Sequence, residues 1–139
     1  MKKKVLIVIA NYYSYISDNL SVGAQTTLDT AKIKYSIKKV PGVFEIPVVI
    51  SRNIKKYDAF IALGCVIKGE TPHFDYISKT TINALMKLSI ENKKPIGNGI
   101  ITALNKKQAR ARCGLYDVVK KKNDKGKEAA NAVIAVLYK

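Results

Sequence analysis

His73 is the only histidine in the chain, and it follows a short glycine-containing loop, Gly69-Glu70-Thr71-Pro72, that leads from an apolar run into a long amphipathic segment. An imidazole gains or loses a proton near neutral pH, which makes His73 the candidate for acid–base catalysis. Backbone N–H groups at the start of a helix lack partners and favour an anion such as phosphate. A histidine that only caps the helix or fills a surface pocket would explain the same position. The pattern by itself leaves both interpretations open.

Residues 41–47 form a second unusual segment, in which Glu45 stands between Phe44 and Ile46 at the expected start of a helix. The helix dipole favours a carboxylate there, which is one explanation of Glu45. A ligand rich in hydroxyl groups is another, because a carboxylate accepts hydrogen bonds from hydroxyls. Residues 11–15 contain three tyrosines, among them Tyr12. Their rings could stack on a flat heterocycle or pack in the ordinary way.

The remaining cations and cysteines give weaker indications. Arg112 falls in the last turn of an expected helix, where a cation offsets the helix dipole, and Lys125 is one of many lysines. Cys65 and Cys113 form no CxxC pair and no metal-ligand spacing with His73. We therefore expect both cysteines to be buried in packing, we expect no metal or other cofactor, and we place the protein in the reducing cytoplasm.

The charge balance is strongly basic, with 25 Lys and Arg against 10 Asp and Glu, a net charge of +15. Such a balance raises the question of nucleic-acid binding. Only three of the 25 basic residues are arginine, the better reader of phosphate and guanine. The chain is also rich in Ile, Asn and Tyr, which share AT-rich codons with Lys. A solvated basic surface is therefore expected rather than a nucleic-acid site, and the longest apolar runs are far too short to span a membrane.

The elements that must position these residues alternate between strands and helices. Strands are expected at residues 5–10, 33–40, 58–67 and 95–102, and helices at 17–31, 44–56, 74–91, 105–113 and 124–137. The helix caps are expected to be Ser17 or Asp18 for the first helix and Asn105 for the fourth. This alternation predicts one α/β domain over residues 1–139, a three-layer α/β/α sandwich around a mostly parallel four-stranded sheet.

Ligands of such sheets bind beyond the carboxyl ends of the strands. That rule directs attention to residues 11–15, 41–46, 66–73 and 98–102. All of the unusual segments described above lie within these ranges or next to them.

The same segments carry a resemblance to a known family. Residues 41–47 (PGVFEIP), 64–76 (GCVIKGETPHFDY) and 97–102 (GNGIIT), supported by 108–112 (QARAR) and 124–126 (DKG), resemble the lumazine synthases in order and in spacing. The resemblance implies a flavodoxin-like fold. It also implies the penultimate reaction of riboflavin biosynthesis, in which a ribitylaminouracil condenses with a dihydroxybutanone phosphate to give dimethyl-ribityllumazine, phosphate and two waters. Members of the family use no cofactor or metal.

The resemblance also implies roles for individual residues. His73 would transfer protons, and Arg112 would grip the substrate phosphate with help from the nearby Lys125 and the backbone at the helix start. The backbone group comprises Gly69, Glu70 and Thr71. The side chains expected around the organic substrate are those near the ribityl chain (Val43, Phe44, Glu45) and those beside the pyrimidine (Tyr12, Cys65, Val66, Ile67, Asn98).

This chain departs from many members at three of these positions. Tyr12 stands where Trp or Phe is frequent, Asn98 where some members have an aromatic residue, and Lys68 where Arg is frequent.

The family builds its site between neighbours in a ring of five. The resemblance therefore implies that Asn98 and Arg112 come from one chain and His73 from the next. The length of residues 114–123 and the short segment before the first strand favour a free pentamer or decamer over a shell of sixty subunits. Three alternatives stay open: a riboflavin synthase-like enzyme, a non-catalytic protein of the same fold that binds a flavin or lumazine, and a non-catalytic basic module that binds RNA through its lysines.

Overall fold

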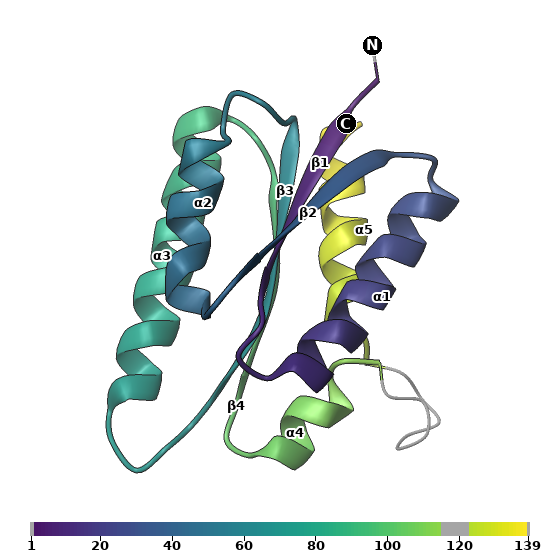
Figure 1. Ribbon diagram of the computed structural model, residues 1–139. Helices are drawn as coiled ribbons and strands as arrows, with labels where there is room; N and C mark the ends of the chain where they lie inside the picture. The colour runs from purple at the N-terminus through teal and green to yellow at the C-terminus, as the bar shows by residue number, and fades with distance from the viewer. Residues whose placement is uncertain (1, 115–122, 139) are drawn as a thin grey trace.

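The computed structural model describes residues 2–114 and 123–138. Within them, the strands β1 (Lys4–Ala10), β2 (Lys34–Val40), β3 (Ala59–Ile67) and β4 (Ile96–Ala103) form one sheet in the order β2-β1-β3-β4 (Figure 1). All three strand pairs are parallel. The expected mostly parallel, four-stranded sheet is confirmed for the described part of the chain, and the pairing there is parallel throughout.

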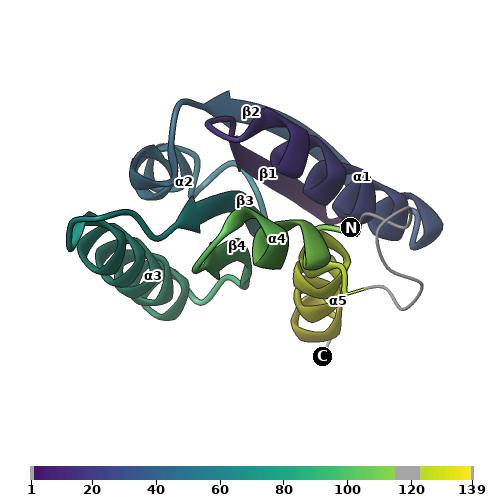
Figure 2. The same cartoon turned by 90° about the horizontal axis from the view of Figure 1, so that it is seen from below.

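Helices cover both faces of the sheet. The helices α1 (Ser14–Thr30) and α5 (Lys125–Leu137) lie on one face, and α2 (Ile46–Arg52) and α3 (His73–Asn92) lie on the other (Figure 1). Viewed from below, the short helix α4 (Lys106–Ala111) sits where β4 ends (Figure 2). The three-layer architecture predicted from the alternation of elements is therefore confirmed. Within the described residues, no helix combines the length and hydropathy needed to cross a membrane.

The strand positions follow from burial. The central strands β1 and β3 are almost continuously apolar and buried, as expected for strands covered on both faces. Successive side chains of these strands point to opposite faces and belong to two separate hydrophobic cores. Ile7 and Ile61 belong to the core under α1 and α5, whereas Leu6 and Phe60 belong to the core under α2 and α3. The edge strand β2 is largely exposed, in line with its alternating sequence.

Of the two predicted caps, that of α4 is present and that of α1 is wrong, and α5 has a cap that was not predicted. Asn105 Oδ1 accepts a hydrogen bond from the Gln108 N–H at 2.9 Å, and Asp124 Oδ1 accepts one from the Lys127 N–H at 3.1 Å. Helix α1 begins at Ser14, one turn before the predicted Ser17. The buried Ser17 hydroxyl instead donates to the Ala10 carbonyl at 2.5 Å, which joins the helix to the end of β1.

The predicted second helix is shorter than expected at both ends. A 3₁₀ turn over Val43–Glu45 precedes α2, and the helix ends at Arg52 rather than at residue 56. Pro47 lies in the first turn of α2, where the missing N–H costs nothing. Most of the segment expected to be long, residues 115–122, lies outside the described residues.

Candidate functional site

A pocket of about 450 Å³ lies at the carboxyl ends of β1, β2 and β3. Eight residues expected at the site line it: Tyr12, Val43, Phe44, Glu45, Cys65, Val66, Ile67 and His73. Three more residues complete the lining: Tyr13, Gly42 and Ile77. The parallel sheet explains this gathering, because the loops that follow neighbouring parallel strands emerge at the same edge.

Backbone hydrogen bonds fix the loops around the pocket. The Asn11 N–H, just after β1, donates to the carbonyl of Val40 at the end of β2 at 2.8 Å. The Lys68 N–H, just after β3, donates to the carbonyl of Ala103 at the end of β4 at 2.9 Å. Each bond ties one strand end to its neighbour. The pocket therefore rests on the rigid sheet rather than on independent loops.

Two exposed aromatic rings stand at the pocket. The side chains of Tyr12 and Phe44 are 75% and 59% exposed, although such rings are usually buried. Tyr13 packs edge-on against Tyr12, with the ring centroids 4.9 Å apart and the planes at 84°. This contact holds the Tyr12 ring at the pocket while leaving most of its surface open. An aromatic heterocycle is a ligand that such a surface fits.

The thiol of Cys65, which lines the pocket, is uncharged at physiological pH. Burial, followed by the proximity of Cys113, raises the pKa of the Cys65 thiol to about 12. Burial, followed by the proximity of Tyr12 and Cys65, likewise raises the pKa of Tyr13. Neither group supplies a thiolate or phenolate near neutral pH, so Cys65 is a wall of the pocket rather than a nucleophile. The other titratable side chains that line the pocket are Tyr12, Glu45 and His73.

His73 is the first residue of α3, and its side chain is exposed. The N-cap of this helix is Pro72, and no side chain forms a cap hydrogen bond there. The His73 backbone N–H donates to Thr71 Oγ1 at 3.3 Å. The imidazole is therefore not occupied in capping the helix, which weakens the structural explanation of its position. Gly69, Glu70 and Thr71 are exposed in the preceding loop, outside the residues that line the pocket.

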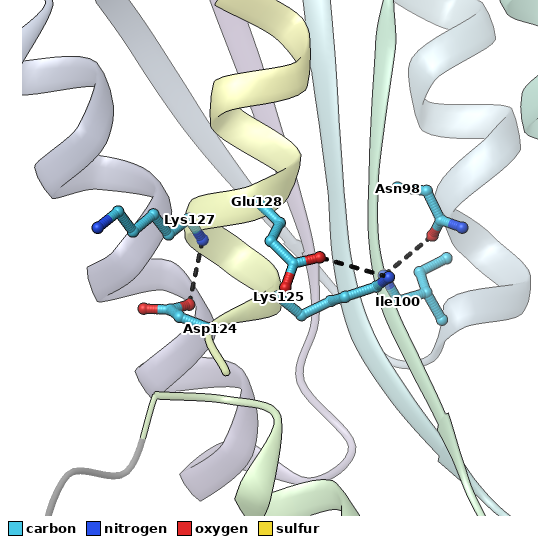
Figure 3. Close-up of polar contacts among 6 residues, drawn as sticks. All are labelled: Asn98, Ile100, Asp124, Lys125, Lys127 and Glu128. Atoms are coloured by element: carbon cyan, nitrogen blue, oxygen red, sulfur yellow. Dashed lines mark hydrogen bonds and ion pairs between the residues drawn. The ribbon is translucent and has the colours of Figure 1, made fainter. Parts of the chain in front are cut away.

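The other expected site residues lie in a second hollow of about 380 Å³. Asn98 on β4, Arg112 after α4 and Lys125 at the start of α5 all line it. Figure 3 marks the ion pair between Lys125 and Glu128, both on α5. The Lys125 ammonium nitrogen lies 4.0 Å from Glu128 Oε1.

The Arg112 guanidinium donates one hydrogen bond, from Nη1 to the Gln108 carbonyl at 2.8 Å. With Lys125 and Arg112 at its rim, this hollow suits an anion.

The rule for parallel sheets directed attention to residues 98–102 near the end of the fourth strand, but Asn98 itself lies well before that end. Asn98 is the third residue of β4 and pairs with Ala62 in the middle of β3. It therefore lies partway along β4, the outermost strand of the sheet, rather than at the carboxyl ends of the strands, where the pocket lies. The described chain thus holds two incomplete groups of site residues, one with His73 and one with Arg112.

Some lining residues were not singled out from the sequence as site residues. Ile77 lies one helical turn after His73, and Glu128 lies one turn after Lys125, so helical spacing was the available signal. Thr102 is four residues from Asn98 on the same face of β4, which strand alternation could have revealed. Among the described residues, no group of three or more His, Cys, Asp or Glu side chains is arranged to hold a metal ion.

Comparison with known proteins gives a consistent result. The family model for 6,7-dimethyl-8-ribityllumazine synthase matches residues 2–139. The chain is 44% identical over 140 residues to a 6,7-dimethyl-8-ribityllumazine synthase of Bartonella henselae, an alignment that covers 98% of this chain and 87% of the relative.

It is 43% identical over 136 residues to the same-named protein of Bartonella bacilliformis, covering 95% of this chain and 88% of the relative. For the same-named protein of Nitrobacter hamburgensis the identity is 40% over 141 residues, covering 96% and 83%. The matches run through both groups of site residues and nearly the whole sheet. The chain therefore belongs to the 6,7-dimethyl-8-ribityllumazine synthase family.

Proposed function

We propose that this protein condenses 5-amino-6-(D-ribitylamino)uracil with 3,4-dihydroxy-2-butanone 4-phosphate to form 6,7-dimethyl-8-ribityllumazine, phosphate and two waters. The observation that carries this proposal is the gathering of Tyr12, Phe44, Glu45 and His73 in one pocket of about 450 Å³. That set offers a stacking surface, an acceptor for hydroxyl groups and a proton-transfer group. Membership of the family supports the same reaction.

Each substrate has a distinct place in this proposal. The pyrimidine ring stacks on Tyr12 beside Cys65, Val66 and Ile67, and the ribityl hydroxyls donate to Glu45 near Val43 and Phe44. His73 moves protons while the amine of one substrate attacks the ketone of the other and while phosphate leaves. Much of the acceleration then comes from holding two reactive molecules together, with acid–base help from His73.

The phosphate needs cations that the pocket with His73 does not contain. Arg112 and Lys125 lie in the separate hollow beside β4, and the Arg112 fork suits a phosphate. We propose that neighbouring chains of a homopentamer join the two groups, so that Asn98, Arg112 and Lys125 of one chain face His73 of the next. The backbone N–H groups of the exposed residues Gly69, Glu70 and Thr71 then complete the phosphate site. We assign the reaction to the cytoplasm.

The reaction is tested by mixing the protein with both substrates and following lumazine by fluorescence and by mass, against a buffer control for the uncatalysed reaction. Arg112→Ala should lower kcat/KM for the phosphate substrate about 10- to 100-fold, the loss of a charge-assisted contact. Arg110→Ala is the matched control, because Arg110 is an exposed arginine two residues earlier that lies over the Tyr15 ring. His73→Ala should cause a smaller loss.

A rate equal to buffer, from folded wild-type protein, would contradict the proposed reaction. Riboflavin formed from lumazine would instead favour the riboflavin synthase-like alternative, and lumazine binding without turnover would favour a binding protein.

Shared sites can be tested separately by mixing two defective variants. If His73 and Arg112 of a site belong to different chains, reassembling equal amounts of His73→Ala and Arg112→Ala chains gives about one complete site in four. Activity should then exceed the mean of the two variants' separate activities, which is the value expected if each site lies within one chain. Activity equal to that mean in mixed assemblies, verified by mass, would contradict a site shared between chains.

A further inference from the structure

The two cations of the hollow beside β4 come from separate elements, and the backbone joins those elements directly. Arg112 follows the last residue of α4, and Lys125 is the first residue of α5. The Lys125 N–H donates a hydrogen bond to the Arg112 carbonyl at 2.9 Å. Next to this bond, Cys113 and Asp124 form an isolated antiparallel bridge. The backbones that carry the two cations are therefore paired with each other.

Asp124 is the buried member of this pairing. It is only 7% exposed, although aspartate is rarely buried to this extent. Its Oδ1 accepts a hydrogen bond from the Lys127 N–H at 3.1 Å (Figure 3), and its backbone carbonyl accepts one from the Glu128 N–H at 3.0 Å. These bonds fix the first turn of α5, which is the turn that carries Lys125.

Two glycines make room for the Asp124 carboxylate. A β-carbon at Gly23 on α1 would lie 2.5 Å from both carboxylate oxygens, and one at Gly114 would lie 2.8 Å from Oδ2. Gly114 also has φ 83°, in the left-handed region that favours glycine. The carboxylate therefore packs against the backbone of α1 and against the segment that follows Arg112. One side chain thus connects α1, the end of the α4 segment and the start of α5.

Capping alone does not require this burial. Asn105 caps α4 through the same kind of hydrogen bond while remaining exposed. The Asp124 side chain faces α1, whereas Lys125 extends to the other side of the helix start, towards the hollow that it shares with Arg112 (Figure 3). Because the two residues are consecutive, a carboxylate fixed on the α1 side also fixes the direction in which Lys125 leaves the helix.

We infer that Asp124 is a positioning residue that holds Arg112 and Lys125 at a spacing at which both can contact one phosphate group. This inference rests on the proposed function. Two cations aimed at one site repel each other before the anion arrives, so their spacing must be imposed by the fold. A backbone fixed in advance also lowers the ordering cost of binding. Asp124 acts through the α5 turn and the paired backbone, without touching the phosphate.

Three substitutions test this role. Asp124→Asn keeps an oxygen for the Lys127 N–H, and asparagine caps a helix as well as aspartate. Asp124→Ala removes the acceptor and leaves a space beside α1. Asp124→Gly also removes the side chain, but glycine is a better N-cap than alanine, so this variant decides if Asp124→Ala does not fold. The matched control is Asn53→Ala, because Asn53 is 8% exposed and loses its own hydrogen bond, to the Val49 carbonyl at 2.7 Å, on the other face of the sheet.

The measurements are KM for each substrate and the dissociation constant of inorganic phosphate, from calorimetry on the assembled protein. Asp124→Ala and Asp124→Gly should raise KM for the phosphate substrate and the dissociation constant of inorganic phosphate about tenfold, because small displacements of binding groups are costly. KM for the aminouracil should stay unchanged. Asp124→Asn should leave all values within about twofold of the wild type, since the cap is kept. Asn53→Ala should match the wild type in all three values.

Four outcomes would overturn the inference. They are wild-type phosphate binding in the folded Asp124→Ala or Asp124→Gly protein, an equal rise in KM for the aminouracil, an equal loss of phosphate binding in Asn53→Ala, and a loss in Asp124→Asn as large as that in Asp124→Ala. The second and third would show a general structural defect, and the fourth would assign the effect to charge. Circular dichroism and sedimentation verify that each variant is folded and assembled.

The proposed reaction can fail independently. If the wild type binds inorganic phosphate but forms no lumazine, and the Ala and Gly variants of Asp124 weaken phosphate binding, the reaction is refuted and the positioning role is supported. If the wild type forms lumazine and these variants bind phosphate equally well, only the positioning role is refuted. If the wild type neither forms lumazine nor binds phosphate, both are refuted.

Discussion

Helices α1 and α5 pack closely against each other at Gly126, and a substitution there tests this contact. A methyl group at Gly126 would overlap the carbonyl oxygen of Leu20, and it would lie 2.9 Å from the Leu20 carbonyl carbon and 3.1 Å from its Cα. All three atoms belong to the backbone of a fully buried residue in the middle of α1. No side chain can rotate to make room, so the two helices must move apart.

The magnitude of the effect follows from this overlap. Non-bonded carbon atoms are most stable at about 3.5 to 4 Å, so Gly126→Ala needs a displacement of about 1 Å between two packed helices. Such overpacking costs about 1–3 kcal/mol. The better helix propensity of alanine offsets at most about 1 kcal/mol, and less at this position in the first turn of α5. We expect a net loss of about 1–2 kcal/mol and a fall in Tm of roughly 3–8 °C.

Urea titrations measure this loss and are made at one fixed chain concentration, because the proposed assembly would make apparent stability concentration-dependent. Gly69→Ala is the matched control, since an added methyl there meets no atom within 4 Å. The reasoning would be refuted if Gly126→Ala were as stable as the wild type. A loss of equal size in Gly69→Ala would show that glycine replacement itself, rather than the helix contact, causes the effect.

Three further outcomes are expected. Lys93→Gly should stabilise the protein by about 0.5–1 kcal/mol, because Lys93 ends α3 with φ 55° in the left-handed region that favours glycine, and Lys93→Ala, which keeps a β-carbon, should not. Asn105→Ala should cost about 1 kcal/mol in urea unfolding through loss of the α4 cap, and a cost near zero would mean that the cap is not formed in solution. Because burial raises the pKa of Cys65 to about 12, the stability due to its protonated thiol is complete below about pH 9 and is lost as the pH rises towards 12. The difference in unfolding free energy between wild type and Cys65→Ala should therefore shrink above pH 9, by at most about 1.4 kcal/mol per pH unit, and a constant difference would contradict the assignment.

Local sequence signals predicted the fold well where they matched the packing. Continuous apolar runs identified the central strands β1 and β3, because only strands covered on both faces can bury every side chain. Asn105 was recognisable as a cap because its oxygen needs only to reach an N–H three residues ahead, and Asp124 caps α5 in the same way although it was not predicted to.

The start of α1 was not predictable in the same way. Tyr13 precedes this helix without forming a side-chain cap, and Ser17, the expected cap, bonds to the distant β1 instead. The start of α1 was therefore set by a contact with β1 rather than by a local cap.

The candidate site was predictable only in part, for a similar reason. Parallel pairing brings the loops after β1, β2 and β3 to one edge, so the shared pocket of Tyr12, Glu45 and His73 follows from topology. Nothing local to β4 reveals that Asn98 shares a hollow with Lys125, which lies 27 positions later. That proximity depends on α5 packing against β4 so closely that Gly97 faces the Ala129 backbone.

The proposal that copies of the chain complete the candidate site also restricts how those copies can be arranged. The group with His73 lies at the carboxyl edge of the sheet, whereas Asn98 lies along the outer side of β4, the last strand in the order β2-β1-β3-β4. These are two different surfaces, so a contact that joins them is heterologous. Repetition of a heterologous contact gives a closed ring or an open filament. In a two-fold dimer both chains contribute the same patch to the interface. Such a dimer could complete sites only if that patch included both the surface with His73 and the surface with Asn98. A ring instead completes one site at every contact and leaves no unmatched surface, which is the physical reason to favour the cyclic assembly.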